Sequence, residues 1–407
     1  MEQHNIMNPI ESIRDRLGDK AANLLLEIRR VANTLGFESF IVGGTVRDLI
    51  LDKPLKDIDV SVIGDAIMLV DEIEAQIAVV AVRHPKFRTA TIKIDDLEID
   101  IVSARSETYI TPGALPQVTL AGIEHDLRRR DFSINAMAIS LNEPYALVDP
   151  LEGMLDLTNG VIKVLHDNSF SDDPTRIFRM FRYSSRFGFI IGTDTVKQVS
   201  NAVTNNFITF ISKERLTNEI SLLLDESNFE KVIEQLLLFK VFPFPCQYRP
   251  VPEFDCESDG FKWIYLINMY DTEFQKALSD MFVWGRQTTK LVTDFVELCG
   301  VINAFDEETL NETNLERIYR LLKQTPRPIM DIYVALNPGT INTRLLEQYI
   351  LYTEQRAVSI DAVELIGLGV EKQQLAEIID MLTILRITGQ IRSKSEEVSV
   401  VVQFVNG

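Results

Sequence analysis

The sequence predicts an α+β fold in which a small mixed β-sheet with helices is followed by all-helical domains. Two observations indicate the sheet: residues 40–42 are an apolar run that ends at a glycine pair, and residues 57–60 alternate acidic and apolar side chains, as a half-buried strand does. A third observation indicates the helices, because apolar side chains recur with helical spacing from residue 170 onward.

The first expected element is a helix over residues 8–36. Its inward face is expected to hold Leu24, Leu25, Ile28 and Val31. Mixed strands and helices then continue to about residue 165. Residues 242–260 are rich in proline and polar side chains, which predicts a loop between two helical parts. The predicted domains are 1–165, 166–245 and 246–407.

A glycine pair stands between the first predicted strand and the next helix. Gly43 and Gly44 follow the apolar run, and a helix that begins at Thr45 would carry Arg47 one turn in. Phosphate oxygens can approach the bare backbone of glycines at a helix start. Taken alone, a Gly-Gly pair is equally consistent with an ordinary tight turn.

Two carboxylates follow closely. Asp57 and Asp59 have the same strand parity, so both project from one face while Ile58 and Val60 enter the core. Paired carboxylates supply the hard oxygen ligands that suit Mg²⁺. Alternating acids also occur on ordinary surface strands, but here they accompany the glycine turn and Arg47 in one strand-turn-helix-strand segment. That combination favours a site for a nucleoside triphosphate and its metal ions.

A third carboxylate is expected on a neighbouring strand. Residues 88–104 indicate two strands joined by a turn at Asp95-Asp96, and Asp100 stands among apolar residues of the second strand. A lone acid in an apolar strand is costly unless it is paired or binds a metal. We therefore expect Asp100 to face the same pocket as the first two carboxylates. Glu98 shares its parity and is the competing candidate.

A charged cluster precedes an apolar segment. Arg129, Arg130 and Asp131 stand before residues 132–140, which are apolar enough to be core but contain Asn135. The arginines can make charge-assisted bonds to triphosphate and ribose; the alternative is a solvated charge run. Asn135 requires a polar partner inside the core.

A possible base-reading pair lies further along. Asp173 and Arg176 are three residues apart, so on a helix they share a face. Cytosine and adenine place an amine donor beside a ring-nitrogen acceptor, whereas guanine and uracil present the reverse. A carboxylate beside a guanidinium can therefore accept C and A and reject G and U. The alternative is that Asp173 caps the helix, with Pro174 at its first position, while Arg176 is exposed.

Five motifs in order resemble those of the class II tRNA nucleotidyltransferases, the CCA-adding family, whose head domain is shared with bacterial poly(A) polymerases. The likeness runs from about residue 38 to residue 220 and continues more weakly to the end. The motifs are GGTVRD with DID (43–59), LRRRDFSINAMA (127–138), DPLEGMLDL (149–157), DDPTRIFRMFRYSSRFGF (172–189) and KERLTNEI (213–220).

The resemblance implies a nucleotidyltransferase head over 1–165, a helical neck with a base-reading helix over 166–245, and a tRNA-binding body and tail over 246–407. It implies ATP and CTP as substrates and two Mg²⁺ ions as cofactors. The implied catalytic and metal-binding residues are Asp57, Asp59 and Asp100. The implied nucleotide-binding residues are Gly43, Gly44, Arg47, Arg105, Arg129, Arg130, Asp131, Asn135, Asp173, Arg176 and Arg179.

Several positions depart from the family pattern. Ser133 stands where Thr is usual, Glu152 replaces the first of two glycines, and Asp172 replaces Glu. In the tail, VEKQQ (370–374) replaces a Pro-Gly-Pro turn, which bears on the tail's contact with tRNA.

Charge and composition narrow the function. The net charge of −19 is unusual for an RNA-binding protein, but residues 174–190 carry four arginines and no acid. We therefore expect tRNA to be held by local patches and by shape, with salt-dependent affinity. Three cysteines without a CxxC pair, no signal pattern and no long apolar run predict a cytoplasmic protein that does not span a membrane. No obligate protein partner is implied.

The predicted activity is Mg²⁺-dependent addition of C and A to the 3′ end of tRNA. The Gly/Pro-interrupted segment 105–120 resembles the family's flexible loop, which predicts that A is incorporated; a simple connector is the alternative. An enzyme that adds only A or only CC shares the same motifs. Poly(A) polymerase, a non-catalytic RNA-binding protein and a hydrolase built on His125-Asp126 fit the sequence less well.

Overall fold

The computed structural model describes residues 8–55, 57–94, 97–108, 113, 116–242, 259–304 and 314–406. The chain divides into two compact units, Met1–Val241 and Phe242–Gly407. The predicted head and neck together form the first unit, and the predicted body and tail form the second. The α+β fold class is confirmed. None of the helices in these described ranges is both long and apolar enough to span a membrane.

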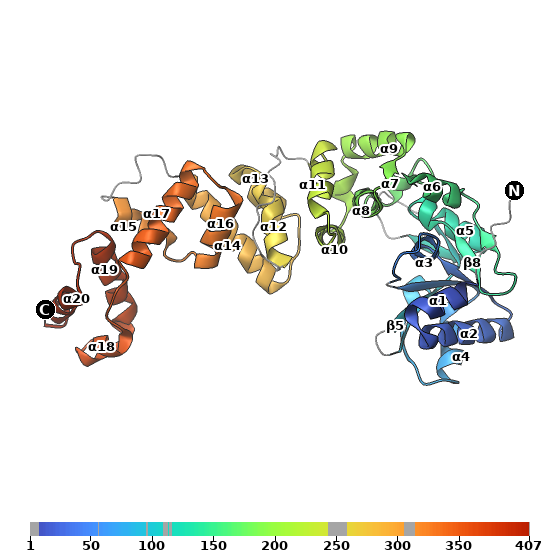
Figure 1. Cartoon of the computed structure of the whole chain (residues 1–407), viewed down its shortest axis with the longest axis horizontal. Coiled ribbons are helices and arrows are strands. Elements are labelled where there is room, and N and C mark those ends of the chain that lie inside the picture. Colours follow the sequence, from blue (N-terminus) through green and yellow to red (C-terminus); the bar gives the residue numbers. More distant parts are fainter. Residues whose placement is uncertain are drawn as a thin grey trace. The chain divides into compact units, whose positions relative to one another are not determined.

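A seven-stranded sheet forms the centre of the first unit (Figure 1). Its strands are β1 (Glu38–Val42), β2 (Ile58–Ile63), β3 (Val80–His84), β4 (Thr89–Ile94), β5 (Leu97–Ser103), β8 (Ala138–Ser140) and β9 (Leu147–Val148). Their order is β3-β4-β5-β2-β1-β8-β9, with β2 and β5 parallel and the other neighbours antiparallel. Both strands predicted within 88–104 are present, while the predicted turn at 95–96 lies outside the described residues.

Helices cover both faces of this sheet. They are α1 (Pro9–Leu17), α2 (Asp19–Thr34), α3 (Gly44–Ile50), α4 (Ala66–Glu74), α5 (Ile123–Arg128) and α6 (Gly153–Asn159), with the short 3₁₀ helices η1 (Pro85–Phe87) and η2 (Ser133–Asn135). The prediction of one helix over 8–36 is wrong, because Gly18 adopts φ +84° and separates α1 from α2. The four side chains predicted to face inward are all buried.

Strand register places the acidic positions on one face of the sheet. Asp59 in β2 is the direct neighbour of Asp100 in β5, and Ser61 is the neighbour of Phe40 in β1. Phe40 packs with Leu127 of α5 in one apolar cluster. Since Asp59 and Ser61 have the same parity, Asp59 and Asp100 project from the face that α5 covers.

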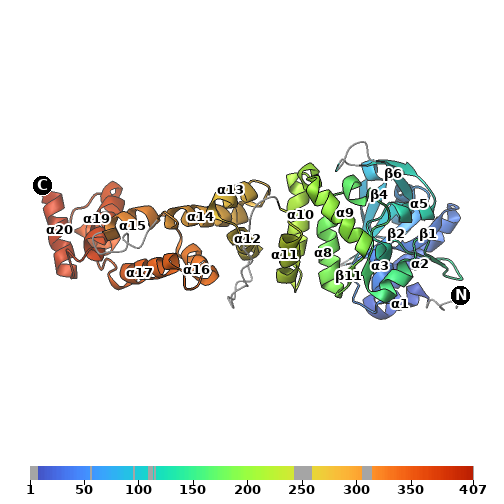
Figure 2. The ribbon, with the colours of Figure 1, turned by 90° about the horizontal axis from the view of Figure 1, so that it is seen from above.

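The neck helices lie beside the sheet in the same unit (Figure 2). They are α7 (Ser169–Asp172), α8 (Arg176–Phe187), α9 (Thr193–Thr204), the 3₁₀ helix η3 (Phe207–Phe210), α10 (Lys213–Leu224) and α11 (Phe229–Leu238). A two-stranded parallel ribbon pairs β10 (Val161–Ile162), which precedes these helices, with β11 (Ile190–Ile191), which lies between α8 and α9. α8 packs against both α10 and α11.

The segment predicted as a flexible loop begins and ends in paired strands. β6 (Arg105–Thr108) and β7 (Gln117–Leu120) form an antiparallel ribbon, and most of the residues between them lie outside the described part. In the hinge-like motif, Glu152 adopts φ +58°, a conformation that favours glycine. Glu152 therefore occupies a position that suits glycine, and it does so at some conformational cost.

The second unit is helical throughout its described residues. Its helices are α12 (Asp259–Asn268), α13 (Thr272–Ser279), α14 (Arg286–Ile302), α15 (Leu315–Leu322), α16 (Arg327–Leu336), α17 (Ile341–Gln355), α18 (Ala362–Gly367), η6 (Lys372–Gln374), α19 (Leu375–Ile387) and α20 (Lys394–Asn406). The predicted loop at 242–260 lies largely outside the described residues, although α12 already begins at Asp259. In place of a Pro-Gly-Pro turn, Glu371 and Gln374 form reciprocal capping contacts at η6.

Candidate functional site

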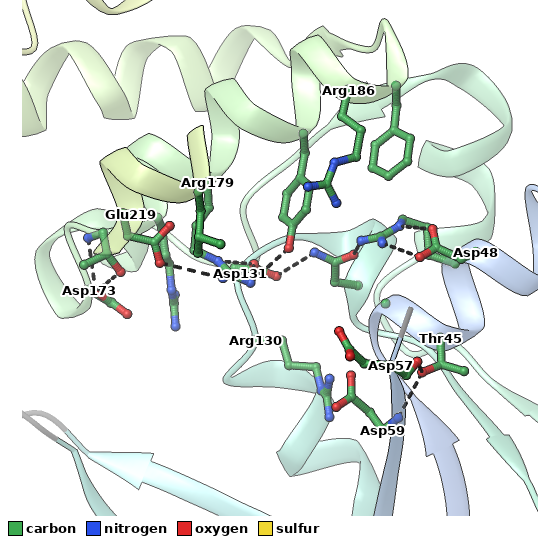
Figure 3. A pocket seen from close by; sticks show the side chains of 18 of the residues that line it. Thr45, Asp48, Asp57, Asp59, Arg130, Asp131, Asp173, Arg179, Arg186 and Glu219 are labelled. Carbon is green, nitrogen blue, oxygen red and sulfur yellow. Dashed lines mark hydrogen bonds and ion pairs between the residues drawn. The ribbon is translucent and has the colours of Figure 1, made fainter. Parts of the chain in front are cut away.

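A cavity of about 1080 Å³ lies in the first unit, beside the start of β2 and next to the neck helices (Figure 3). Side chains reach it from α3, β2, β6, the segment that follows α5, η2, α8 and α10. It brings together every predicted site residue except Gly43, which adjoins it, and Asp100. The geometry of these side chains shows what the cavity can bind.

The glycine turn and the first two carboxylates meet at one end of the cavity. Gly43 has φ +68°, which strains any other residue, and a Cβ there would lie 2.5 Å from Nη1 of Arg130 and 3.6 Å from Oδ2 of Asp59, so a side chain at this position would displace Arg130. The Thr45 hydroxyl donates to the Asp57 carbonyl and accepts from the Asp59 amide, which ties α3 to the start of β2. Burial raises the pKa of Asp59, the Arg130 guanidinium opposes this effect, and the neighbouring carboxylates reinforce it.

Asp100 stands beside Asp59 on the adjacent strand but is exposed and does not line the cavity. Its carboxylate accepts a hydrogen bond of 2.5 Å from the Thr91 hydroxyl. Glu98, the competing candidate, is exposed and forms an ion pair with Lys93 on β4. The position next to Asp59 therefore favours Asp100 over Glu98 as the third carboxylate.

The carboxylates of the site suit a hard divalent cation, although they do not form a complete coordination shell by themselves. Among the described residues, no three acidic, histidine or cysteine side chains converge closely enough to hold a metal ion. Mg²⁺ is commonly held by one or two carboxylates while water and substrate phosphates complete its coordination. Asp57 and Asp59, which face the cavity together, fit that requirement.

Arg47 is buried rather than free in the cavity. Its Nε and Nη2 donate to both carboxylate oxygens of Asp48 at 2.9 and 2.8 Å, and its Nη1 donates to Oδ1 of Asn135 at 2.5 Å. The guanidinium also lies 5.2 Å from the ring centre of Tyr183 and 4.8 Å from that of Phe187. Asn135 thereby has the polar partner that its position in the core requires.

Asp131 is the most strongly held carboxylate of the site. Its Oδ2 accepts two bonds from Arg179, at 2.9 and 2.7 Å, and its Oδ1 accepts from Nδ2 of Asn135 and the Phe132 amide. Burial alone would raise the pKa of Asp131, but the Arg179 charge and these hydrogen bonds outweigh burial and hold it at about 2. Burial would lower the pKa of Arg179, but the charge and hydrogen bonds of Asp131, together with Tyr183 and Glu219, outweigh burial and raise it. The pair is ionised at any physiological pH.

A buried acid that was not predicted holds the arginine cluster. Asp126 is fully buried; its carboxylate accepts from Arg129 and Arg130, and more weakly from the Arg105 amide. Glu107 accepts from both Arg105 and Arg129. The cluster is therefore ordered rather than a solvated charge run. The sequence contained a signal for this contact, because Asp126 lies three residues before Arg129 and four before Arg130, a spacing that brings side chains together on a helix.

Asp173 does not share a helical face with Arg176, because α8 begins only at Arg176. Pro174 lies within a local turn in which Oδ1 of Asp173 accepts from the amide and hydroxyl of Thr175. The same oxygen accepts from Arg215 at 2.8 Å. Asp173 thus combines a cap-like contact with an ion pair to α10 while still lining the cavity.

Arg176 is only 5% exposed, so the alternative in which it is solvent-exposed is wrong. Its Nη1 donates to the Ser169 hydroxyl at 2.7 Å, and its Nη2 donates to the Arg129 carbonyl at 2.8 Å. These contacts fix the Arg176 guanidinium against the first residue of α7 and against the backbone of the arginine cluster. The carboxylate and guanidinium therefore both face the cavity but are held by different partners.

Helix α10, which carries the KERLTNEI motif, braces α8 and the segment before it through ion pairs of two motif residues. Arg215 binds Asp173, and Glu219 forms ion pairs with Arg179 and Arg182 at 3.9 and 3.7 Å. Burial raises the pKa of Glu219 in spite of these arginines. His125 lies exposed on α5, as expected, and is not part of the cavity lining.

Comparisons with known proteins identify the family of this chain. Residues 39–163 match the poly A polymerase head domain. The A-adding tRNA nucleotidyltransferase of Halalkalibacterium halodurans is 30% identical over 100% of this chain and 97% of its own length. The chain belongs to the class II tRNA nucleotidyltransferase family. The resemblance drawn from its motifs is thus confirmed.

Two further family members extend the comparison. The A-adding tRNA nucleotidyltransferase of Aquifex aeolicus is 33% identical over 84% of this chain, which spans only 44% of that protein. The structure of the Thermotoga maritima CCA-adding enzyme complexed with tRNA has a TM-score of 0.71 and 28% identity, and covers 98% of each chain. Similarity thus extends over both units.

Proposed function

We propose that this protein is a nucleotidyltransferase that transfers nucleotides from ATP or CTP to the 3′ end of tRNA. The observation that carries the proposal is the single cavity in which a glycine turn, two carboxylates and an ordered set of guanidinium groups meet. These groups suit the three parts of a nucleoside triphosphate: its phosphates, its ribose and its base.

At the phosphate end, we propose that Asp57 and Asp59 hold Mg²⁺, with Asp100 beside them on β5. When bound, this metal would lower the pKa of the attacking 3′-hydroxyl and neutralise phosphate charge. The bare Gly43-Gly44 backbone leaves room for phosphate oxygens, and Arg130 stands within reach of the same place. The protein thus positions the reacting groups and stabilises charge, which supplies most of the rate in phosphoryl transfer.

At the ribose and base end, the fixed side chains select the nucleotide. Asp131 and Asn135 present hydrogen-bonding groups suited to a ribose, and Arg179 holds Asp131 in place. Asp173 and Arg176 offer an acceptor and a donor to the base edge. Because their partners in α7, α10 and the arginine cluster fix both side chains, they can discriminate by geometry.

For the product, we propose addition of A. The two relatives compared above, which match over most of this chain, are both named A-adding. Complete CCA addition, the activity predicted from the sequence, is the second candidate, favoured by similarity to a CCA-adding enzyme over both units. Both candidates require that A be incorporated.

The test offers tRNA transcripts that end at the discriminator base, at C and at CC, with CTP and ATP supplied separately and together. Product length is read on a denaturing gel, with Asp57→Ala as the inactive control. Extension of only the CC-ending transcript, by one A, is expected. Growth by three nucleotides from the discriminator end would establish CCA addition instead. No incorporation into any transcript would overturn the transferase proposal.

A further inference from the structure

Tyr183 occupies a central position that the proposed chemistry leaves unassigned. It lies in the middle of α8 and is 7% exposed. Four guanidinium groups surround its ring, with their central carbons 5.2 to 5.9 Å from the ring centre. They belong to Arg47, Arg179, Arg182 and Arg186. Arg47 comes from α3, and the other three arginines come from α8 itself.

The contacts of Tyr183 belong to a closed ring of neighbouring side chains. Its hydroxyl accepts from Nη2 of Arg179 at 3.1 Å, and Arg179 binds Asp131. Asp131 accepts from Asn135, which in turn accepts from Arg47. Arg47 then returns to the ring of Tyr183. One side chain therefore touches both the arginine beside the ribose-reading residues and the arginine of the glycine-turn helix.

The aromatic rings restrain the orientation of the Arg47 guanidinium in addition to its hydrogen bonds. Asp48 and Asn135 accept hydrogen bonds from the Arg47 guanidinium, and its central carbon also lies over the rings of Tyr183 and Phe187. The two rings lie nearly parallel, at 21°, with centres 6.1 Å apart. A guanidinium beside aromatic rings gains electrostatic stabilisation that an aliphatic leucine cannot supply.

We infer that Tyr183 is a positioning residue for nucleotide binding: its ring sets the orientation of Arg47 and its hydroxyl that of Arg179, so that α8 aligns the triphosphate and ribose ends of the cavity. The inference rests on the proposed function, since it concerns the same cavity. Although Tyr183 lines the cavity, the inference assigns it a role in holding the two arginines and not a contact with the substrate. Its effect passes through the two arginines.

The test compares Tyr183→Leu and Tyr183→Phe with the wild type in the full-length protein. Phe181→Leu is the matched control, because Phe181 is a fully buried aromatic on the same helix that packs against Phe239 and lines no part of the cavity. The measurements are KM and kcat for ATP on a CC-ending transcript, KM for that transcript, binding of ATP without tRNA, and the melting temperature.

Tyr183→Leu should raise KM for ATP and weaken ATP binding about tenfold, equivalent to about 1.4 kcal/mol. KM for the transcript should not change. Tyr183→Phe retains the ring and should restore most of the ATP affinity. Phe181→Leu should lower the melting temperature without raising KM for ATP.

Two results would overturn the inference: a Tyr183→Leu protein that melts earlier but binds ATP as tightly as the wild type, or a Tyr183→Phe protein as impaired as Tyr183→Leu. Failure of the proposed function would be distinct, because the wild type itself would then add no nucleotide to any transcript.

Discussion

Replacement of Asp131 by Asn should destabilise the first unit by about 2.4 kcal/mol at neutral pH. The value follows from the carboxylate's pKa, which lies at about 2 in the fold against 3.8 for an ordinary Asp. No discount for solvent is needed, because Asp131 is only 8% exposed. Asn keeps the shape of the side chain but leaves the Arg179 guanidinium without the carboxylate that balances its charge.

The effect has a defined pH dependence. The pKa of Asp131 is lower in the folded state than in the unfolded state, so its contribution is fully present above the unfolded value of 3.8. The contribution is lost as the pH falls through the folded value of about 2. The difference in stability between the wild type and the Asn variant should therefore be largest at neutral pH and should shrink as the medium is acidified over this window.

Urea unfolding can isolate the first unit, because both tryptophans, Trp263 and Trp284, lie in the second unit. Far-ultraviolet circular dichroism reports both units, and tryptophan fluorescence reports the second alone. Asp194→Asn is the control, since it removes an exposed carboxylate paired with Lys197 and should change little. A stability difference for Asp131→Asn that stays constant from neutral pH to pH 2 would refute the reasoning.

Three further predictions concern the cavity. Asp59→Ala should reduce transfer by at least ~10³, roughly 4 kcal/mol of barrier, while tRNA binding in a filter assay stays nearly intact; activity within tenfold of the wild type would contradict the metal assignment. Asp173→Ala with Arg176→Ala should relax discrimination against UTP and GTP by ~1–3 kcal/mol for each lost base contact, measured as kcat/KM ratios. Retained selectivity would show that the pair only supports the fold. Gly43→Ala should weaken ATP binding in a direct titration, because the added Cβ would meet Arg130 at 2.5 Å; unchanged affinity would refute the close approach.

Local pattern was sufficient to predict the elements that carry the carboxylates. The alternation around Asp59 and Asp100 and the glycine pair before α3 are short-range signals, and the structure places β2, β5 and α3 there. The helix over 8–36 was mispredicted because the apolar spacing continues across Gly18, whose positive φ only the fold reveals.

Side-chain partners were less predictable than the elements. Asp173 and Arg176 suggested a pair by spacing, but each binds a residue distant in sequence, Arg215 or the backbone of Arg129. Spacing predicts which side chains share a face only within one helix, and here Pro174 keeps Asp173 outside α8. Long-range partners depend on how α8 and α10 pack, which no local pattern encodes.

The charge of the cavity explains why the reaction should need a divalent cation. Its described lining holds nine arginine or lysine side chains and nine aspartate or glutamate side chains, and the carboxylates of Asp48, Asp131 and Glu226 already pair with arginines. Under the proposed function, these side chains orient a triphosphate, but the cavity lining lacks surplus positive charge to balance it. ATP binding without tRNA should therefore weaken when EDTA removes divalent cations and recover with added Mg²⁺. Equally tight binding in EDTA would show that the arginines suffice.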